Sequence, residues 1–148
     1  MNRNIVLLLK QLNLSLEQYG RAQMKQLDLS PSQSFALDFL FDHEGKIVYA
    51  TEMHEQFGIS KAAISATLKG LRHKGYLDMM ASPEDDRKKQ IVLTEKAYAL
   101  KEKIDASLLE QQNRLCRNIP QQRLALLEED LNKMLHNLRP EMTGREEA

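Results

Sequence analysis

The chain has 148 residues with 21 basic and 21 acidic side chains, so its net charge gives no argument for a nucleic-acid partner. The length suits one domain, or one domain with added dimerisation helices. A single cysteine, Cys116, excludes an internal disulfide and a cysteine-rich zinc site. The apolar run Ile5 to Leu9 is too short to span a membrane and lacks a signal-peptide cleavage pattern, so we expect a cytoplasmic protein.

Residues 3 to 27 are predicted to form an amphipathic helix of about six turns, because apolar side chains recur mostly at steps of three and four. Leu7 and Leu14 widen its apolar face beyond one core contact, which indicates a second surface to cover. The residues of this helix that we expect to hold a second copy of the chain are Ile5, Leu8, Leu9 and Leu12.

The next helix is predicted to begin at the run Ser30-Pro31-Ser32-Gln33. The first serine can cap the helix, proline fits the first helical position, and glutamine completes a capping box. The helix is almost wholly apolar from Phe35 to Phe41, which indicates a central position, and Gly45 is expected to end it. A short β-prone run, Ile47 to Tyr49, follows.

A helix-turn-helix pattern comes next in the chain. Thr51 is predicted to cap a short helix, and Gly58 to end it in the left-handed conformation, with Ile59 buried in the turn. Ser60 is predicted to cap a second helix that runs to Lys74. A helix, a tight glycine turn and a second helix are the order found in helix-turn-helix DNA-binding proteins.

Two strands, 76–80 and 90–93, are predicted to form a hairpin around the charged loop 82–89. A hairpin directly after a helix-turn-helix is a wing. Thr94 is then predicted to cap one long helix, whose apolar face comprises Ala97, Leu100, Ile104, Leu108 and Leu115.

Pro120 is predicted to start a last helix, and Pro140 to end it. Its apolar residues recur at steps of 3, 4, 3 and 4, the spacing of a coiled-coil seam, which predicts that this helix contributes to a dimer. The seam residues are Leu124, Leu127, Leu131, Met134 and Leu138.

These elements predict a mainly α fold with a small β-hairpin, that is, a winged helix-turn-helix flanked by dimerisation helices. The predicted parts are an N-terminal dimerisation helix (1–29), the winged helix-turn-helix DNA-binding domain (30–93), C-terminal dimerisation helices (94–139) and a polar tail (140–148) expected to be disordered.

Residues 60 to 74 carry four cations and no acid, within a neutral chain. Ile64, Leu68 and Leu71 fall on one helix face, and small and basic residues fall on the other. Small residues let a helix enter the major groove, where alanine contacts a thymine methyl group and serine bonds base edges or phosphate. The residues of this segment expected to bind DNA are Ser60, Lys61, Ala62, Ser65, Ala66, Lys69, Arg72 and Lys74. The alternative is a solvated basic face.

The wing tip carries three acids followed by three cations. Arg87 is expected to enter the minor groove, where narrow A·T tracts concentrate negative potential, and Lys88 and Lys89 to bind phosphates. Asp85 is expected to brace Arg87 through a charge-assisted hydrogen bond. The alternative is an ordinary charged loop.

Taken in order, several motifs resemble the MarR family of multiple antibiotic resistance regulators over roughly residues 5 to 138. The motifs are Leu29-Ser30-Pro31-Ser32-Gln33, Gly58-Ile59-Ser60, Leu71, Gly75-Tyr76-Leu77, Asp85-Asp86-Arg87 and Leu93-Thr94-Glu95-Lys96. The wing motif Asp-x-Arg followed by Leu-Thr is the most specific of them.

This resemblance implies a two-fold dimer held by the first and the last two helices, with one recognition helix in each major groove and one wing in each minor groove. Members mostly repress transcription, and many release DNA when a small, often aromatic or phenolic, ligand binds between the dimerisation and DNA-binding regions. Two positions depart from the family pattern: Ala66 stands where many relatives carry a large polar or basic residue, and Ala97 where a glycine is common. Gly70, inside a helix, costs about 1 kcal/mol relative to alanine, and the sequence offers no reason for it.

Other chemistries find little support in the sequence. The histidines His43, His54, His73 and His136 show no metal-ligand spacing, so we expect no metal. Cys116, beside two arginines, is interpreted as a packing residue rather than a redox sensor. Core filling is favoured over pocket lining for four methionines, Met24, Met53, Met79 and Met80.

No nucleophile–base pair, phosphate loop or pair of catalytic acids is present, so the sequence predicts neither an enzyme nor a cofactor. The predicted function is sequence-specific binding of double-stranded DNA by a homodimer, with repression at a pseudo-palindromic operator. The alternatives are a winged-helix module for protein association and a non-specific architectural DNA binder. An association helix would more often present apolar or aromatic anchors where helix 60–74 presents small and cationic residues.

Overall fold

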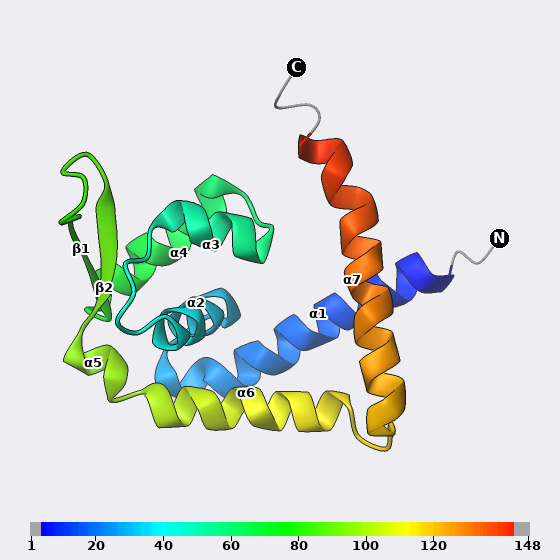
Figure 1. Ribbon diagram of the computed structural model, residues 1–148. Coiled ribbons are helices and arrows are strands. Elements are labelled where there is room, and N and C mark those ends of the chain that lie inside the picture. The colour runs from blue at the N-terminus through cyan, green and yellow to red at the C-terminus, as the bar shows by residue number, and fades with distance from the viewer. Residues whose placement is uncertain (1–3, 144–148) are drawn as a thin grey trace. The chain divides into compact units, whose positions relative to one another are not determined.

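The structure, a computed structural model, describes residues 4–143 as helices joined to one β-hairpin (Figure 1), which confirms the predicted fold class. Its elements are α1 (Asn4–Met24), the 3₁₀ helix η1 (Lys25–Leu27), α2 (Pro31–Asp42), α3 (Ala50–Phe57), α4 (Lys61–His73), β1 (Leu77–Ala81), β2 (Lys89–Leu93), α5 (Glu95–Tyr98), α6 (Lys101–Leu115) and α7 (Gln121–Thr143). The chain divides between Gln111 and Gln112 into two compact units, which are described separately. In the described part, no helix has the length and apolar character needed to cross a membrane.

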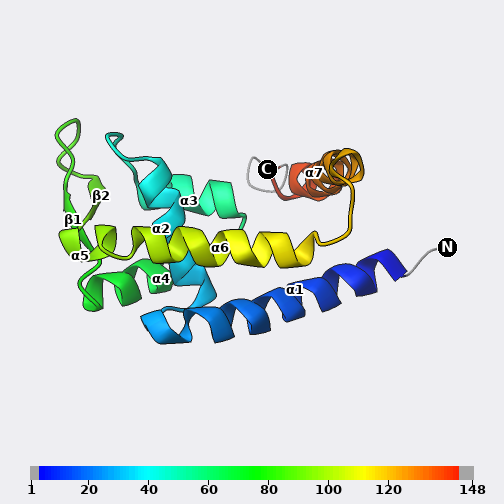
Figure 2. The ribbon, with the colours of Figure 1, turned by 90° about the horizontal axis from the view of Figure 1, so that it is seen from below.

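Helix α2 forms the centre of the first unit, as its apolar run predicts. Ala36, Leu37, Leu40 and Phe41 are buried in one core with residues from α4, the hairpin, α5 and α6. In Figure 1, α2 lies between α1 and α4. Helix α1 packs beside α6 (Figure 2), where the buried Gln111 side chain donates a hydrogen bond to the Leu16 carbonyl at 3.3 Å.

The start of α2 is the predicted capping box. The Ser30 hydroxyl accepts a hydrogen bond from the Gln33 backbone at 3.2 Å, and the Gln33 side-chain oxygen accepts one from the Ser30 backbone at 3.1 Å. Pro31 occupies the first helical position, where its missing N–H costs nothing. Two of the otherwise unpaired donors at this helix end are therefore satisfied locally.

The segment before α3 differs from the prediction. Ile47 to Tyr49 form no strand, although the Val48 carbonyl accepts a hydrogen bond from the Ile91 backbone of β2 at 2.9 Å. Tyr49 stays extended and caps α3 without a side-chain bond, so the helix begins at Ala50. Thr51 therefore lies within the first turn of α3 and is not its cap. The hydrogen bond between Val48 and β2 keeps the chain extended up to Tyr49, and the helix starts directly after it.

The turn between α3 and α4 is partly as predicted. Gly58 adopts the left-handed conformation, with φ of 66°, and Ser60 caps α4 by accepting a hydrogen bond from Ala63 at 3.1 Å. Ile59 is 38% exposed, however, and not buried as expected. Ile59 instead helps to line an apolar hollow between α2, α3 and α4.

The wing is an antiparallel hairpin whose register runs from Leu77 opposite Leu93 to Ala81 opposite Lys89. Its strands lie within a residue of the predicted ones. Gly75, with φ of 81°, reverses the chain between α4 and β1, and the Tyr76 backbone donates to the Leu71 carbonyl there. The hairpin projects beyond the helices in Figure 1.

The single helix predicted after Thr94 is two helices, α5 and α6. Thr94 does cap α5, accepting a hydrogen bond from Ala97. At the break, the Leu100 backbone donates to the Ala97 carbonyl, three residues back instead of four, which tightens the chain and redirects the helix axis. Ala97 and Ile104 are fully buried on either side of this break, so core packing holds it in place.

In the second unit, α7 starts after Pro120, whose carbonyl accepts hydrogen bonds from Arg123 and Leu124. This confirms the predicted start. The helix continues through Pro140 to Thr143, which corrects the predicted end. A proline removes one backbone donor, and a long helix can continue past that loss. Residues 144–148 of the predicted tail lie outside the described residues.

The structure supplies a reason for Gly70. A Cβ atom at this position would lie 2.7 Å from the side-chain amide nitrogen of Gln33, closer than van der Waals contact allows. The Gln33 side chain is not free to move away, because its oxygen is bonded to the Ser30 backbone. The glycine therefore makes room for the capping box of α2 against the middle of α4.

We predict that Gly70→Ala and Gln33→Ala are strongly non-additive in the free energy of unfolding. In a Gln33→Ala background, Gly70→Ala should stabilise the protein by about 1 kcal/mol through helix propensity. In the natural chain, displacement of Gln33 should cancel that gain. Urea unfolding of the four proteins at one concentration measures the coupling. Ala66→Gly, on the exposed face of α4, is the control and should cost the same in both backgrounds. An equal gain from Gly70→Ala in both backgrounds would contradict the contact.

Candidate nucleic-acid interface

Helix α4 has two chemically different faces. Ile64, Leu68 and Leu71 are buried in the core, as predicted from their spacing. The residues predicted to contact base edges, Lys61, Ala62, Ser65, Ala66 and Lys69, are all exposed. The Ser60 hydroxyl caps the helix by accepting a hydrogen bond from the Ala63 backbone, so it fixes where α4 begins. A small and cationic helix face is thus held outward by an apolar face that is anchored inward.

The cations of α4 line a half-open hollow of about 340 Å³ beside the wing. Lys61, Lys69 and Arg72 lie on its α4 side, and Met79 of β1 lies across from them. Arg72 forms an ion pair with Asp78 of β1, with 3.6 Å between Nε and Oδ1. This pair connects the basic end of α4 to the wing strand and draws Arg72 toward the wing.

The wing tip holds Arg87 away from the protein. Its side chain is 95% exposed, and its Nε lies 4.0 Å from Asp85 Oδ1. The same carboxylate oxygen accepts a hydrogen bond from the Arg87 backbone at 3.0 Å, and the Asp85 carbonyl accepts one from Lys88. Asp85 therefore forms the turn and lies beside the Arg87 side chain, but the predicted charge-assisted hydrogen bond is not formed, because 4.0 Å is too long for one. Lys88 and Lys89 are exposed beside them.

Two residues that fix the wing were not predicted from the sequence. Ser82 is buried at the wing root, and its hydroxyl is hydrogen-bonded to the Tyr49 hydroxyl at 2.6 Å. The Ser82 backbone also donates to the Lys88 carbonyl, which closes the tip, and the Lys88 ammonium lies 5.3 Å from the centre of the Tyr49 ring. A serine before a proline carries the signal of an ordinary loop, so the sequence alone does not distinguish it.

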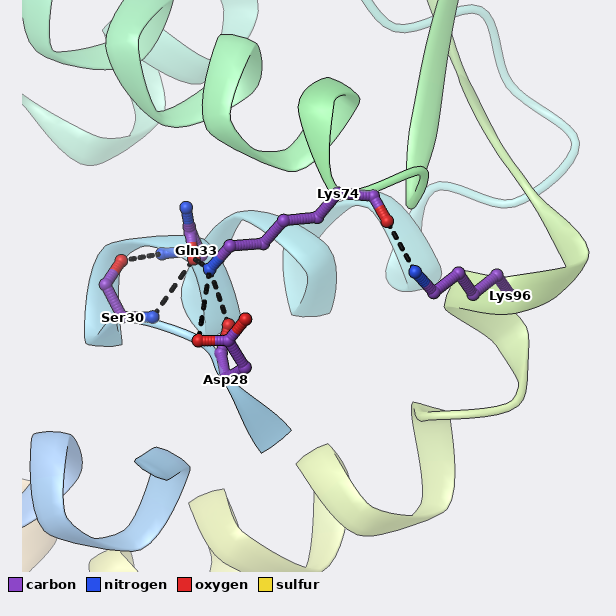
Figure 3. Close-up of polar contacts among 5 residues, drawn as sticks. All are labelled: Asp28, Ser30, Gln33, Lys74 and Lys96. Carbon is purple, nitrogen blue, oxygen red and sulfur yellow. Dashed lines mark hydrogen bonds and ion pairs between the residues drawn. The ribbon is translucent and has the colours of Figure 1, made fainter. Parts of the chain in front are cut away.

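Lys74 is placed differently from the other predicted DNA contacts. Its side chain is 28% exposed, and the ammonium donates hydrogen bonds to the Asp28 carbonyl at 2.5 Å and to the Gln33 side-chain oxygen at 3.0 Å (Figure 3). The ammonium is thus engaged within the protein, on the α2 side of α4. The structure does not bring it to the exposed face with Lys61 and Lys69.

The methionines and the cysteine singled out in the sequence lie in different parts of the structure. Met24 and Met53 are buried in the core, Met79 is partly buried against it, and Met80 is exposed on the wing. Cys116 is half-buried. Within residues 4–143, no three histidine, cysteine or acidic side chains are grouped to hold a metal ion.

Comparison with known proteins identifies the fold to which this arrangement of helices and hairpin belongs. Residues 29–97 match the family model described as a winged helix DNA-binding domain. No curated protein sequence matches the chain. Solved structures match nearly its whole length. The transcription regulator MarR from Oenococcus oeni is 21% identical, and the match covers 91% of this chain and 98% of that chain with a TM-score of 0.71. MepR from S. aureus in complex with DNA is 20% identical, and the match covers 90% of this chain and 97% of that chain with a TM-score of 0.83.

A third structure is CouR from Rhodococcus jostii bound to p-coumaroyl-CoA, at 17% identity, 90% and 92% coverage and a TM-score of 0.80. The chain thus has the winged-helix fold, with the recognition helix at α4 and the wing at β1–β2. Within that class, its fold is that of the MarR-family transcription regulators, which confirms the resemblance found in the sequence.

We predict that Arg87→Ala weakens binding to the protein's own DNA site at least tenfold and lessens its preference for A·T pairs at the wing position. The side chain is held outward with no other protein role, so its loss should leave the thermal stability unchanged. Fluorescence anisotropy on sites that differ at the wing position measures both effects. Lys103→Ala, an exposed cation of α6, is the matched control and should bind normally. Unchanged affinity of Arg87→Ala would refute the assignment of the wing.

Proposed function

We propose that the chain is a sequence-specific regulator of transcription that binds double-stranded DNA and represses from a pseudo-palindromic operator. The observation that carries this proposal is the outer face of α4, which is small, cationic and exposed beside an outward-held Arg87. A helix of this composition fits the major groove, and a single arginine at a wing tip fits the minor groove. The DNA-bound relative with the same fold supports it.

Each contact has a distinct role in this proposal. Bases would be read by Lys61, Ala62, Ser65, Ala66 and Lys69, while Arg87 reads the minor groove. Arg72, Lys88 and Lys89 would bind the phosphate backbone and set the register. Alanine at position 66 leaves this part of the helix without a long polar side chain, so a thymine methyl group is the base feature that it suits.

Exposed apolar faces support a homodimer. On α1, Ile5, Leu8, Leu9 and Leu12 are exposed, and on α7 so are Leu127, Leu131 and Leu138. Several large apolar side chains exposed along one helix are costly to leave in water and mark a surface that another chain covers. A second copy is the proposed partner, because a two-fold dimer would place two α4 helices about one turn of DNA apart, as a pseudo-palindrome requires.

A protein-association module and a non-specific DNA binder are the competing functions. The outward residues of α4 from Lys61 to Lys69 include no aromatic or large apolar side chain of the kind that anchors protein interfaces. A non-specific binder needs only phosphate contacts, whereas this surface adds small residues that allow close approach to bases.

The test is selection of fragments from the source organism's genomic DNA by the purified protein across a salt series. We expect a few fragments sharing an inverted repeat, with affinity that falls steeply with salt. Light scattering of the free protein should give twice the 17.1 kDa of one chain. Lys69→Ala should lose about 1–3 kcal/mol on the selected site and little on random DNA. Recovery of all fragments would favour an architectural binder, and recovery of none at physiological salt would favour protein association.

An effector site is the second part of the proposal. A half-open apolar hollow of about 160 Å³ lies between α2, α3 and α4, and its lining includes Phe35, Phe57, and Ile64 and Thr67 of α4. A cavity of ~150 Å³ lined by apolar side chains is enough to hold benzene. We propose a small aromatic or phenolic ligand here, and the ligand-bound relative supports that chemistry. Occupancy would shift α4 only if the ligand binds one arrangement of α4 better than the other.

We predict that phenolic acids such as 4-hydroxybenzoate and 4-hydroxycinnamate release the protein from its selected DNA, whereas acetate at equal concentration does not. Thr67→Phe should fill the hollow and abolish release while leaving DNA affinity within about threefold, because Thr67 lies between the buried and DNA-facing sides of α4. Titration of preformed complexes followed by anisotropy measures both effects. Equal release from the natural and Thr67→Phe proteins would place any effector elsewhere.

A further inference from the structure

Lys74 closes the C-terminal end of α4, and its ammonium joins that end to a distant part of the chain. It donates to the Asp28 carbonyl at 2.5 Å and to Gln33 Oε1 at 3.0 Å, and it lies 4.0 Å from Asp28 Oδ1. Asp28 follows η1 at the end of α1 and adopts the left-handed conformation, with φ of 54°. One side chain therefore bonds the recognition helix to the connection between α1 and α2 (Figure 3).

Gln33 makes this connection rigid because it serves two helices at once. Its side-chain oxygen accepts from the Ser30 backbone and from Lys74, and its amide nitrogen faces Gly70. The start of α2 thus touches α4 at both Gly70 and Lys74, one turn apart on the same face. A rotation of α4 about its own axis would break one contact or the other.

The same helix end is held from a second side. The Lys96 ammonium of α5 donates to the Lys74 carbonyl at 2.6 Å and lies 4.8 Å from the centre of the Tyr76 ring. The Thr94 hydroxyl donates to the Gly75 carbonyl at 2.7 Å. The carbonyls of the two residues that follow α4, Lys74 and Gly75, are therefore bound by residues that come after the wing in the chain.

We propose that Asp28, Gln33, Gly70, Lys74 and Lys96 form a clamp that positions the recognition helix, and that Lys74 acts on DNA binding through this clamp and not by contacting phosphate. The inference rests on the proposed DNA-binding function. Binding constellations must be held to within about 0.5 Å to work. Most of the proposed reading residues, namely Lys61, Ala62, Ser65 and Ala66, lie in the half of α4 away from the clamp. A small change in the direction of the α4 axis at Lys74 would therefore displace Lys61 and Ser65, which lie far from that end, by a larger distance.

Salt dependence distinguishes a positioning residue from a phosphate contact. Loss of one cation that touches phosphate lowers the slope of log affinity against log salt by about one. Loss of a residue that only orients α4 lowers affinity at every salt concentration and leaves the slope unchanged. Gln33 adds a sharper criterion, because its side chain is uncharged and its replacement by leucine removes no charge that could change the salt slope.

The experiment compares the natural protein with Lys74→Met, Gln33→Leu, Gln33→Glu and Lys69→Ala on the selected operator across a salt series. Lys74→Met and Gln33→Leu should each weaken binding about tenfold with unchanged slope. The double variant should be weakened by less than the product of the two single effects, because the Lys74–Gln33 hydrogen bond is lost in both. Gln33→Glu keeps an acceptor for Ser30 and Lys74, so it should restore affinity to within about threefold. Lys69→Ala is the exposed-cation comparison at the DNA-facing side of α4.

Hydrogen exchange provides a second measurement that does not involve DNA. The amides of Lys74 and Tyr76, bonded to the carbonyls of Gly70 and Leu71, should exchange faster in Lys74→Met than in the natural protein. This measurement and Lys74→Met carry the test if Gln33→Leu does not fold.

Three results would overturn the clamp. A slope lower by about one in Lys74→Met, with normal binding by Gln33→Leu, would make Lys74 a phosphate contact. Normal operator affinity in both variants, well below their melting temperatures, would restrict the cluster to stability. Unchanged amide exchange in Lys74→Met would show that α4 is not held there. Failure of the natural protein to prefer any operator over random DNA would instead overturn the proposed function, and the clamp's part in it.

Discussion

The side chain of Gln33 is the constraint on which the DNA-binding part of the molecule depends. It caps α2 through Ser30, it lies close against Gly70 of α4, and it accepts a hydrogen bond from Lys74. Each of these contacts is worth about 1 kcal/mol on its own. Because all three use one amide, the start of the central helix and the end of the recognition helix form as a unit, and the capping box has a role well beyond its own helix.

A neutral chain makes a basic surface by separating its charges in space. Cations and no acids occur from Ser60 to Lys74, and two acids of the wing lie beside cations: Asp78 beside Arg72, and Asp85 beside Arg87. These exposed pairs add little stability. Their effect is on position, since each places an acid within 4.0 Å of an exposed arginine that is proposed to contact DNA.

Local features of the sequence predicted much of this arrangement. The capping box at Ser30, the left-handed turn at Gly58 and the buried face of α4 depend on residues three or four positions apart, so a linear pattern contains them. The proximity of Asp85 to Arg87 is also local and follows from the sequence, although the hydrogen bond that forms comes from the Arg87 backbone and not from its side chain.

The errors in the prediction arise where distant residues decide. The ammonium of Lys74 is bound 46 residues away in the chain, at Asp28, and the hydroxyl of Tyr49 is bound 33 residues away, at Ser82. Local patterns do not contain such pairs, so Lys74 was read as one more cation of a basic helix and the wing root was missed. The break between α5 and α6 has the same origin, because burial of Ala97 against the core outweighs the local preference for one continuous helix.

The clamp and the apolar hollow act on different parts of α4, and together they define how the helix would move. The hollow contacts Ile64 and Thr67, in its middle, whereas the clamp holds the end from Gly70 to Lys74. A ligand that pushes on the middle of a helix fixed at one end displaces the other end most. That other end carries Lys61, Ala62 and Ser65, the residues proposed to read bases. A small ligand with no contact to DNA would therefore have its largest effect where specificity resides, provided that the clamp holds.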